Sequence, residues 1–175
     1  DKWIKIPSHE AYNFELINFA LNNFQKIMIS AGCLKKNELN KLIKLISSKK
    51  IYKSKTTLLH CVSSYPLKTT DCNFQKFKYI KSKLNKVGYS GHLQGIEDSV
   101  YALFNGAEII EKHFTINNKL PGRDNKFALT YKDLSLLNNF RKSFEEFKIN
   151  KGLDLQKCEI DIFKNYRGRW SKKIN

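Results

Sequence analysis

Residues 56–62, Thr-Thr-Leu-Leu-His-Cys-Val, form a run of β-type residues without an acidic or basic side chain other than His60, and the run ends at Ser63 and Ser64. Such a run, rich in β-branched and apolar residues and bounded by turn residues, is typical of a β-strand. Four further short runs of β-type composition occur, and the starts of successive runs are about 20–30 residues apart: Trp3 to Ile6, Lys26 to Ile29, Val87 to Tyr89 and Glu108 to Phe114. The sequence therefore predicts five strands.

Segments with helical periodicity separate and follow these runs. Apolar residues recur every three or four positions in five stretches: Phe14 to Phe24, Glu38 to Ile46, Phe74 to Leu84, Ile96 to Phe104 and Leu134 to Phe147. Strands that alternate with helices predict an α/β fold with a parallel sheet, because parallel neighbours need a crossover and a helix is the usual one.

The same alternation fits either an open sheet or a (β/α)8 barrel. No GxGxxG or GxxxxGK[ST] motif follows a strand, which disfavours the nucleotide-binding open sheets. Polar residues instead cluster where the strands end, as they do at the active-site face of a barrel. Five βα units are too few to close a barrel, which usually takes about 250 residues.

Composition predicts a globular protein. The chain has 175 residues, of which 41% are hydrophobic and 13% aromatic, enough to form the core of one domain. No apolar run approaches the roughly 20 residues that a membrane helix needs, and the first residues do not resemble a signal peptide. We therefore expect a cytoplasmic protein that does not associate with a membrane.

The strong positive charge points only weakly to a nucleic-acid partner. The formal net charge is +16, but 28 lysines and 4 arginines carry the positive side, and recognition of phosphates and bases favours arginine. We expect the main domain to cover residues 1–150 and a basic tail to cover 151–175. The tail motif Tyr-Arg-Gly-Arg-Trp at 166–170 is the best argument for the alternative function, a non-catalytic barrel fragment or polyanion-binding module.

The cysteines show no metal or redox motif. No CxxC pair occurs among Cys33, Cys61, Cys72 and Cys158, so neither a zinc ribbon nor a dithiol motif is predicted. We expect reduced thiols, with Cys61 in the core.

Four serines and one lysine stand at the ends of the predicted strands. Ser8, Ser30, Ser63 and Ser90 occupy corresponding positions there, and Lys5 precedes the first of them. Four hydroxyls and an ammonium group are suited to hold a phosphate. A single serine at such a position is more often a turn or cap residue, but four in corresponding positions favour a site.

Two histidines also follow predicted strands, and their role has two interpretations. His92 and His113 are 21 residues apart, with one predicted helix between them. On adjacent parallel strands their side chains converge, either as ligands of a catalytic metal with open coordination positions or as hydrogen-bonded residues of a barrel rim. Glu10 and Asp124 lie in loops after the first and last strands, where they bind sugar hydroxyls, take part in acid–base steps or remain solvated.

Seven motifs resemble those of one enzyme family. In chain order they are Lys5-Ile-Pro-Ser-His-Glu10, Ile29-Ser-Ala-Gly32, Leu58-Leu-His-Cys61, Ser64-Tyr-Pro66, Gly88-Tyr-Ser-Gly-His92, Glu111-Lys-His-Phe-Thr115 and Pro121-Gly-Arg-Asp124. Their order and spacing resemble the sialic acid synthases, that is the N-acetylneuraminate synthases with the legionaminate and pseudaminate synthases as close relatives. The resemblance extends from Ile4 to about Arg141.

This resemblance implies a (β/α)8 barrel and a defined reaction. Phosphoenolpyruvate condenses with an N-acylated mannosamine-type sugar to give a nonulosonic acid and phosphate, with a divalent metal that is typically Mn²⁺, or else Mg²⁺ or Co²⁺. By resemblance, the metal ligands are His92 and His113, and the catalytic set adds Glu10. The residues matching the phosphoenolpyruvate site are Lys5, Ser8, Ser30, Ser63 and Ser90, and those around the sugar are Glu10, Tyr65 and Asp124. The resemblance also implies a homodimer for a full-length enzyme.

Several features depart from the family pattern. His9 stands where the family usually has glycine, so it either crowds the site or lies at the rim, and the position of Ser63 is Asn in some members. The chain begins at what resembles the fourth barrel strand and lacks the antifreeze-like carboxyl-terminal domain. We therefore expect about the last five βα units of the barrel, as a fragment or a split gene product that is incomplete on its own.

Overall fold

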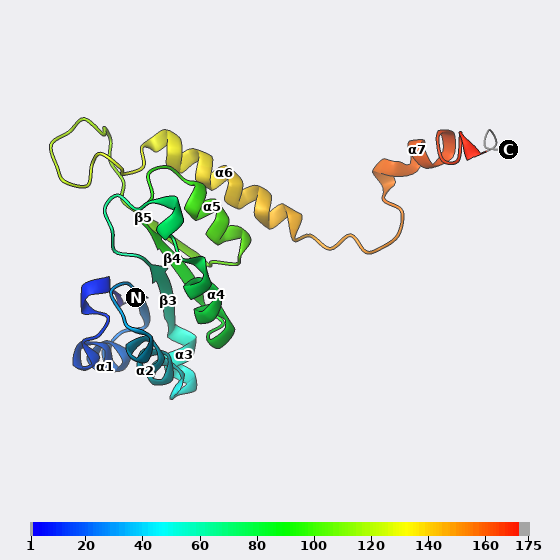
Figure 1. The fold of residues 1–175 in the computed structure, drawn as a ribbon. Helices are drawn as coiled ribbons and strands as arrows, with labels where there is room; N and C mark the ends of the chain where they lie inside the picture. Colours follow the sequence, from blue (N-terminus) through cyan, green and yellow to red (C-terminus); the bar gives the residue numbers. More distant parts are fainter. Residues whose placement is uncertain (1, 172–175) are drawn as a thin grey trace. The chain divides into compact units, whose positions relative to one another are not determined.

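The computed structural model describes residues 2–171 and contains one parallel sheet. Its strands run in chain order across the sheet, and all four neighbouring pairs are parallel (Figure 1). The strands are β1 (Trp3–Ile6), β2 (Lys26–Ser30), β3 (Thr56–Cys61), β4 (Val87–Gly91) and β5 (Ile109–Lys112). The five predicted strands are thus confirmed, and their ends agree with the prediction to within two residues.

Helices connect the strands. They are α1 (Phe14–Asn23), α2 (Lys36–Ser47), α3 (Lys50–Lys55), α4 (Phe74–Lys83), α5 (Glu97–Phe104), α6 (Tyr131–Phe147) and α7 (Ile160–Asn165), with short 3-10 turns η1 (Ser8–Glu10), η2 (Thr69–Asp71) and η3 (Lys157–Glu159). Helix α4 contacts β3 and β4, and α5 contacts β4 and β5. The short helices α3 and α7 were not predicted.

Local signals fix the starts of the first two long helices. The Asn13 side chain accepts a hydrogen bond of 3.1 Å from the Leu16 amide and so caps α1. At the start of α2, the Lys35 amide donates to the Glu38 carboxylate at 2.7 Å. Each bond satisfies an amide that helix geometry leaves without a backbone partner, which explains why the helices begin at these residues.

The core lies between the sheet and its helices. All six residues of β3 are buried, including Leu58 and Leu59, as expected of the central strand of a covered parallel sheet. Phe77 of α4 and Tyr89 of β4 are each 1% exposed. Full burial of a large apolar side chain contributes about 1.5–3 kcal/mol, so the packing of this layer contributes substantially to stability.

The sheet is curled into a half-barrel. β1 and β5 are at opposite ends of the strand order, and in a flat sheet they would be roughly 19 Å apart. The Lys5 Nζ of β1 nevertheless lies 3.0 Å from the Glu111 Oε2 of β5. The inner faces of the two outer strands therefore approach each other, which explains how polar residues from all five strand ends share one region.

The chain forms two compact units that divide after Phe144. In the second unit the Arg167 guanidinium lies 4.5 Å from the centroid of the Phe163 ring, next to α7. Arg169 lies 5.8 Å from the Tyr166 ring and 5.7 Å from the Trp170 ring. The expected boundary between residues 150 and 151 stays a prediction, and residues 172–175 of the expected tail lie outside the described residues.

Between residues 2 and 171 no helix has both the length and the hydropathy of a membrane span.

Candidate active site

The carboxyl ends of β1, β2 and β3 meet at a pair of hydroxyl groups. Ser63 donates to the Ser8 Oγ at 2.8 Å, although the two residues are 55 positions apart. Gly32 fits between them: a Cβ there would overlap Ser63 Oγ and lie 2.7 Å from the Ser8 Cβ. Glycine at this position allows the two serines to come together.

Ser30 is the last residue of β2, the strand between β1 and β3. It is 2% exposed, and its hydroxyl is one of the buried polar groups that have no hydrogen-bond partner in the described structure. A buried hydroxyl without a partner is unfavourable, and a bound anion with several acceptor oxygens is one way to satisfy it. The hydroxyl is therefore suited to a phosphate oxygen.

Glu111 joins the two sides of the half-barrel. Its Oε1 accepts a hydrogen bond of 2.8 Å from Ser90, and its Oε2 forms the 3.0 Å ion pair with Lys5. Two of the residues expected to hold phosphate therefore share one carboxylate. Glu111 was not among the predicted site residues, but its position two residues before His113 on a strand places both on one face, and this period-two pattern is visible in the sequence.

The two histidines lie next to each other, as their spacing predicts. The ring centroids of His92 and His113 are 5.5 Å apart. The Tyr65 ring packs against both, at 4.3 Å from His92 and 6.0 Å from His113. Phe127 lies 5.3 Å from the His113 ring. The two imidazoles thus pack against aromatic rings at the ends of β4 and β5.

One hydrogen bond sets the tautomer of His92. Its Nδ1 is 2.9 Å from the Val62 carbonyl oxygen, which only accepts, so Nδ1 carries the proton and Nε2 keeps its lone pair. Burial lowers the pKa of His92, while the bond to Val62 opposes this shift. A neutral imidazole held by a backbone carbonyl is the form that binds metals.

The donor set fits an open metal site and not a closed one. Within residues 2–171 no group of three or more His, Cys, Asp or Glu side chains is placed to hold a metal ion. Two imidazoles alone leave coordination positions for water and for substrate oxygens, which suits a catalytic metal. His92 and His113 together with Ser90 line a cavity of about 190 Å³.

The two remaining predicted site residues have different surroundings. Asp124 Oδ2 lies 3.8 Å from His113 Nδ1, so its loop folds back onto the histidine pair. Glu10 lies in η1, and its Oε2 accepts a hydrogen bond of 2.9 Å from Asn13 at the start of α1. The structure thus brings Asp124 to the histidines and holds Glu10 at the β1 side of the rim. His9 is exposed, which places it at the rim as well.

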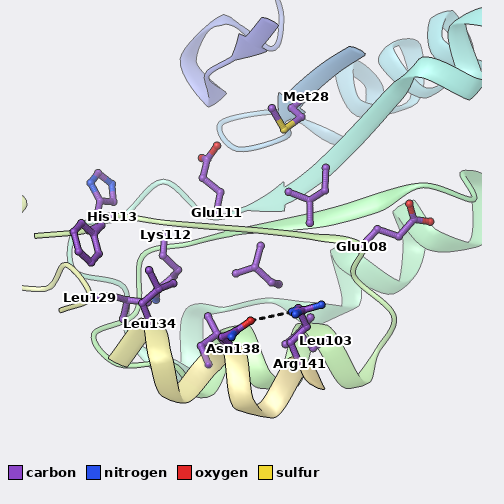
Figure 2. A pocket seen from close by; sticks show the side chains of 14 residues that line it. Met28, Leu103, Glu108, Glu111, Lys112, His113, Leu129, Leu134, Asn138 and Arg141 are labelled. Carbon is purple, nitrogen blue, oxygen red and sulfur yellow. Dashed lines mark hydrogen bonds between the residues drawn. The ribbon is translucent and has the colours of Figure 1, made fainter. Parts of the chain in front are cut away.

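A larger apolar groove adjoins the site, and its lining includes side chains from both faces of β5. It has a volume of about 520 Å³ and is lined by residues of β5 and α6 together with Met28 of β2. Figure 2 shows Glu111 on the side of β5 that faces Met28 and Lys112 on the opposite side. Neighbouring residues of one strand therefore serve different layers.

Fold and site together define a class: a parallel βα half-barrel with a lysine–glutamate ion pair, serine hydroxyls and two imidazoles at the carboxyl ends of its strands. The family model described as "NeuB family" matches residues 2–151. The chain belongs to this family.

Comparison with characterised proteins agrees with this assignment. The chain is 33% identical over 147 residues to an N-acetylneuraminate-9-phosphate synthase of Drosophila melanogaster, covering 82% of this chain and 38% of the relative. It is 32% identical over 137 residues to an N,N'-diacetyllegionaminic acid synthase of Campylobacter jejuni, covering 78% of this chain and 41% of that protein. The chain thus spans about two fifths of the length of these curated relatives.

A solved structure shares the fold. The N-acetylneuraminic acid synthetase of Leptospira borgpetersenii, crystallised in complex with citrate, superposes with a TM-score of 0.78 at 30% sequence identity. The match covers 98% of this chain and 59% of that one. The predicted α/β fold, as a curled five-stranded half-barrel, and the resemblance to sialic acid synthases are therefore confirmed.

Proposed function

We propose that this chain provides the phosphate-binding and metal-binding strand ends of a sialic acid synthase-type enzyme that condenses phosphoenolpyruvate with an N-acylated mannosamine-type sugar. The observation that carries the proposal is the Lys5–Glu111–Ser90 bridge across the half-barrel beside the His92–His113 pair. These two groups lie on the same inner face, where a phosphate ester and a sugar aldehyde have to meet.

The residues divide the work between binding and orientation. Lys5 neutralises the phosphate of phosphoenolpyruvate, and the hydroxyls of Ser8, Ser30, Ser63 and Ser90 position it. Because these donors come from separate strands of one rigid sheet, they act as a preorganised anion site and move no proton. Binding of a phosphate requires Lys5 and Ser90 to exchange Glu111 for the ligand.

The sugar binds along the rim of the site, between the histidine side and the β1 side. Tyr65 provides an aromatic wall beside the histidines, and Asp124 and Glu10 accept hydrogen bonds from sugar hydroxyls. C3 of phosphoenolpyruvate forms the new bond to the aldehyde carbon, whose oxygen takes up a proton. Water adds at C2, and the bond between C2 and the phosphate oxygen breaks to release phosphate. Holding both reactants in this geometry accounts for much of the rate.

His92 and His113 would hold a divalent metal. The resemblance to the sialic acid synthases favours Mn²⁺, an ion that accepts water and substrate oxygens in the open positions. When bound, such an ion supplies Lewis-acid polarisation of a carbonyl oxygen. The rings of Tyr65 and Phe127 lie beside the pair and would border the ion.

The test is the release of inorganic phosphate from phosphoenolpyruvate with N-acetylmannosamine and Mn²⁺. The assay uses this chain alone and then this chain with the preceding barrel segment of a relative supplied as a second polypeptide. We expect release only in the second case, and we expect His92→Ala to abolish it. His60→Gln is the matched control, since His60 is a buried histidine outside the site. Failure of a correctly assembled complex to release phosphate would contradict the proposal.

A further inference from the structure

A buried ion pair lies directly behind the histidine pair. Lys112 Nζ is 3.2 Å from Asp98 Oδ2, and the side chains are 6% and 0% exposed. Lys112 is the fourth residue of β5, and Asp98 is the second residue of α5. The pair therefore lies between the sheet and its helices, in a layer that is filled mainly by apolar residues such as Ala102 and Phe77.

Asp98 is fully satisfied by its neighbours. Lys112 Nζ contacts both carboxylate oxygens at 3.2 Å, and the Tyr89 hydroxyl donates to Oδ2 at 3.0 Å. The Ser99 amide donates to Oδ1 at 2.7 Å. Burial lowers the pKa of Lys112, and the neighbouring Asp98 carboxylate opposes this shift. The network thus links β4, α5 and β5.

The network also holds the backbone beside both histidines. Lys112 Nζ donates a short bond of 2.6 Å to the carbonyl oxygen of Leu93, the residue after His92. Lys112 itself precedes His113. The Lys112 ammonium group therefore connects the backbone that follows His92 to the strand residue that precedes His113.

The packing around Gly91 tightens this connection. A Cβ on Gly91 would lie 2.5 Å from Asp98 Oδ2, 2.6 Å from a Tyr89 ring carbon and 3.1 Å from Lys112 Cδ. Gly91 immediately precedes His92, and only its lack of a side chain allows the ion pair to lie against the backbone there. The end of β4 is therefore in direct contact with the ion pair.

Stability alone does not account for a buried ion pair in this layer. Desolvation of two charges largely cancels their attraction, and well-packed apolar residues of similar volume stabilise a protein as well or better. A buried pair with fixed partners does, however, specify one geometry. Because the pair contacts Leu93 and Gly91, the geometry that it specifies is that of the backbone on either side of His92.

We propose that the Lys112–Asp98 pair is a positioning device that fixes the separation and orientation of His92 and His113. The inference rests on the metal-binding role in the proposed function. It adds that two residues whose side chains are buried behind the histidines set how well the histidines bind an ion. Residues that orient metal ligands in this way usually contribute about 10–100-fold to affinity.

The test is the double variant Lys112→Met/Asp98→Asn, which removes both charges and keeps a side-chain carbonyl for hydrogen bonding. Mn²⁺ binding is measured by the loss of the electron paramagnetic resonance signal of the free ion. We expect the dissociation constant to rise about 10–100-fold while circular dichroism and cooperative unfolding are retained. Lys81→Met is the matched control: Lys81 also donates to a backbone carbonyl, that of Asn105 at 2.7 Å, and its variant should bind Mn²⁺ as the wild type does.

A second readout needs no metal. Long-range ¹H–¹⁵N correlation spectra of the imidazoles report the tautomer, and the wild type should show a protonated Nδ1 and an unprotonated Nε2 for His92. In the double variant these two ¹⁵N shifts should move toward each other as the ring loses its fixed orientation. If the double variant keeps both the Mn²⁺ affinity and the His92 shifts of the wild type, the positioning role is wrong.

The outcomes separate this inference from the proposed function. If the wild type does not bind Mn²⁺, the metal role fails, and the His92 shifts alone decide the positioning role. If the double variant does not fold, Lys112→Arg replaces it, because it keeps the charge beside Asp98 and changes the reach to the Leu93 carbonyl. A folded Lys112→Arg variant with unchanged Mn²⁺ affinity and unchanged His92 shifts would overturn the inference.

Discussion

Two consecutive residues of β5 form ion pairs on opposite faces of the sheet. Glu111 pairs with Lys5 on the inner face, where the side chains of Lys5 and Glu111 are 27% and 40% exposed. Lys112 pairs with Asp98 between the sheet and α5, where the exposures are 6% and 0%. Each pair joins a lysine ammonium to a carboxylate, at N–O distances of 3.0 and 3.2 Å. The two pairs therefore differ mainly in their exposure to solvent.

The difference in exposure gives the two pairs different uses. The inner pair can exchange Glu111 for a ligand, and the outer pair keeps one fixed geometry. Solvent screens the inner pair, so its net contribution is about 0–1 kcal/mol and a phosphate can take the place of Glu111 at little cost. The outer pair is shielded from water, and separation of its charges leaves a buried charge without a partner. The strand's alternation thus places binding on one face and positioning on the other.

The largest expected effect comes from breaking the outer pair. Lys112→Met leaves the Asp98 carboxylate buried without its cation, and we expect a loss of about 3–5 kcal/mol in the free energy of unfolding. Urea denaturation measures it. The double variant Lys112→Met/Asp98→Asn should recover most of the loss, and a single-variant loss below about 1 kcal/mol would show that the pair is not shielded as described.

Breaking the inner pair should affect activity and leave stability nearly unchanged. Lys5→Met removes a preorganised cation, and we expect kcat of the assembled enzyme to fall about 10²–10³-fold. The free energy of unfolding should change by no more than about 1 kcal/mol. Lys26→Met on neighbouring β2 is the control, because Lys26 Nζ lies over the Trp3 ring at 4.3 Å and not in the site. Equal losses of activity in both variants would remove the special role of Lys5.

A third comparison uses a buried titratable group that has no partner charge. Burial lowers the pKa of His60 to about 4, and its Nε2 donates to the Cys72 carbonyl at 2.8 Å. In the unfolded chain, His60 is protonated below about pH 6.5. In the folded chain it is protonated only below about pH 4. The associated stability is complete above pH 6.5 and falls by ~3 kcal/mol as the pH drops to 4.

Urea denaturation across this pH range checks the effect. His60→Gln keeps a donor near the position of Nε2 and does not titrate, so its free energy of unfolding should vary less between pH 6.5 and pH 4 than that of the wild type. Identical slopes for the two proteins would assign the acid sensitivity to other groups.

The smallest effect is expected for the ion pair with the most exposed side chains. Lys148 Nζ lies 2.7 Å from Glu145 Oε1, and both side chains are more than half exposed. Glu145→Gln should change the free energy of unfolding by less than about 0.5 kcal/mol, because solvent and side-chain entropy offset the attraction. A thermal unfolding shift as large as that of Lys112→Met would show that exposure does not order the three pairs.

The sequence predicts the strands and the long helices because burial imposes a period on them. The run from Thr56 to Val62 is apolar because both faces of β3 are covered, and the structure ends the strand at Cys61. Helix α3 was missed because its six residues carry four charged or polar side chains beside Ile51 and Tyr52, too few apolar positions to show a period. Helix α7 is equally short.

Candidate site residues were predictable where they stand at strand ends, and the contacts between them were not. The serines and His92 follow apolar runs, so their common edge could be inferred. Asp98 was not predicted as buried, since it lies at the start of an amphipathic helix, where acidic residues usually face solvent and favour the helix dipole. Its partner Lys112 is 14 positions away, and only the structure shows that the two meet.

The curled sheet has a consequence for the solution behaviour of this chain. In the described residues β1 and β5 form its two edges, each with backbone donors and acceptors that another strand can pair with. A net charge of +16 repels other copies over about 10 Å at 0.1 M salt and over much shorter distances at 1 M. The lysine-rich composition thus acts as a colloidal stabiliser, and the solubility limit of the chain should fall as salt is added.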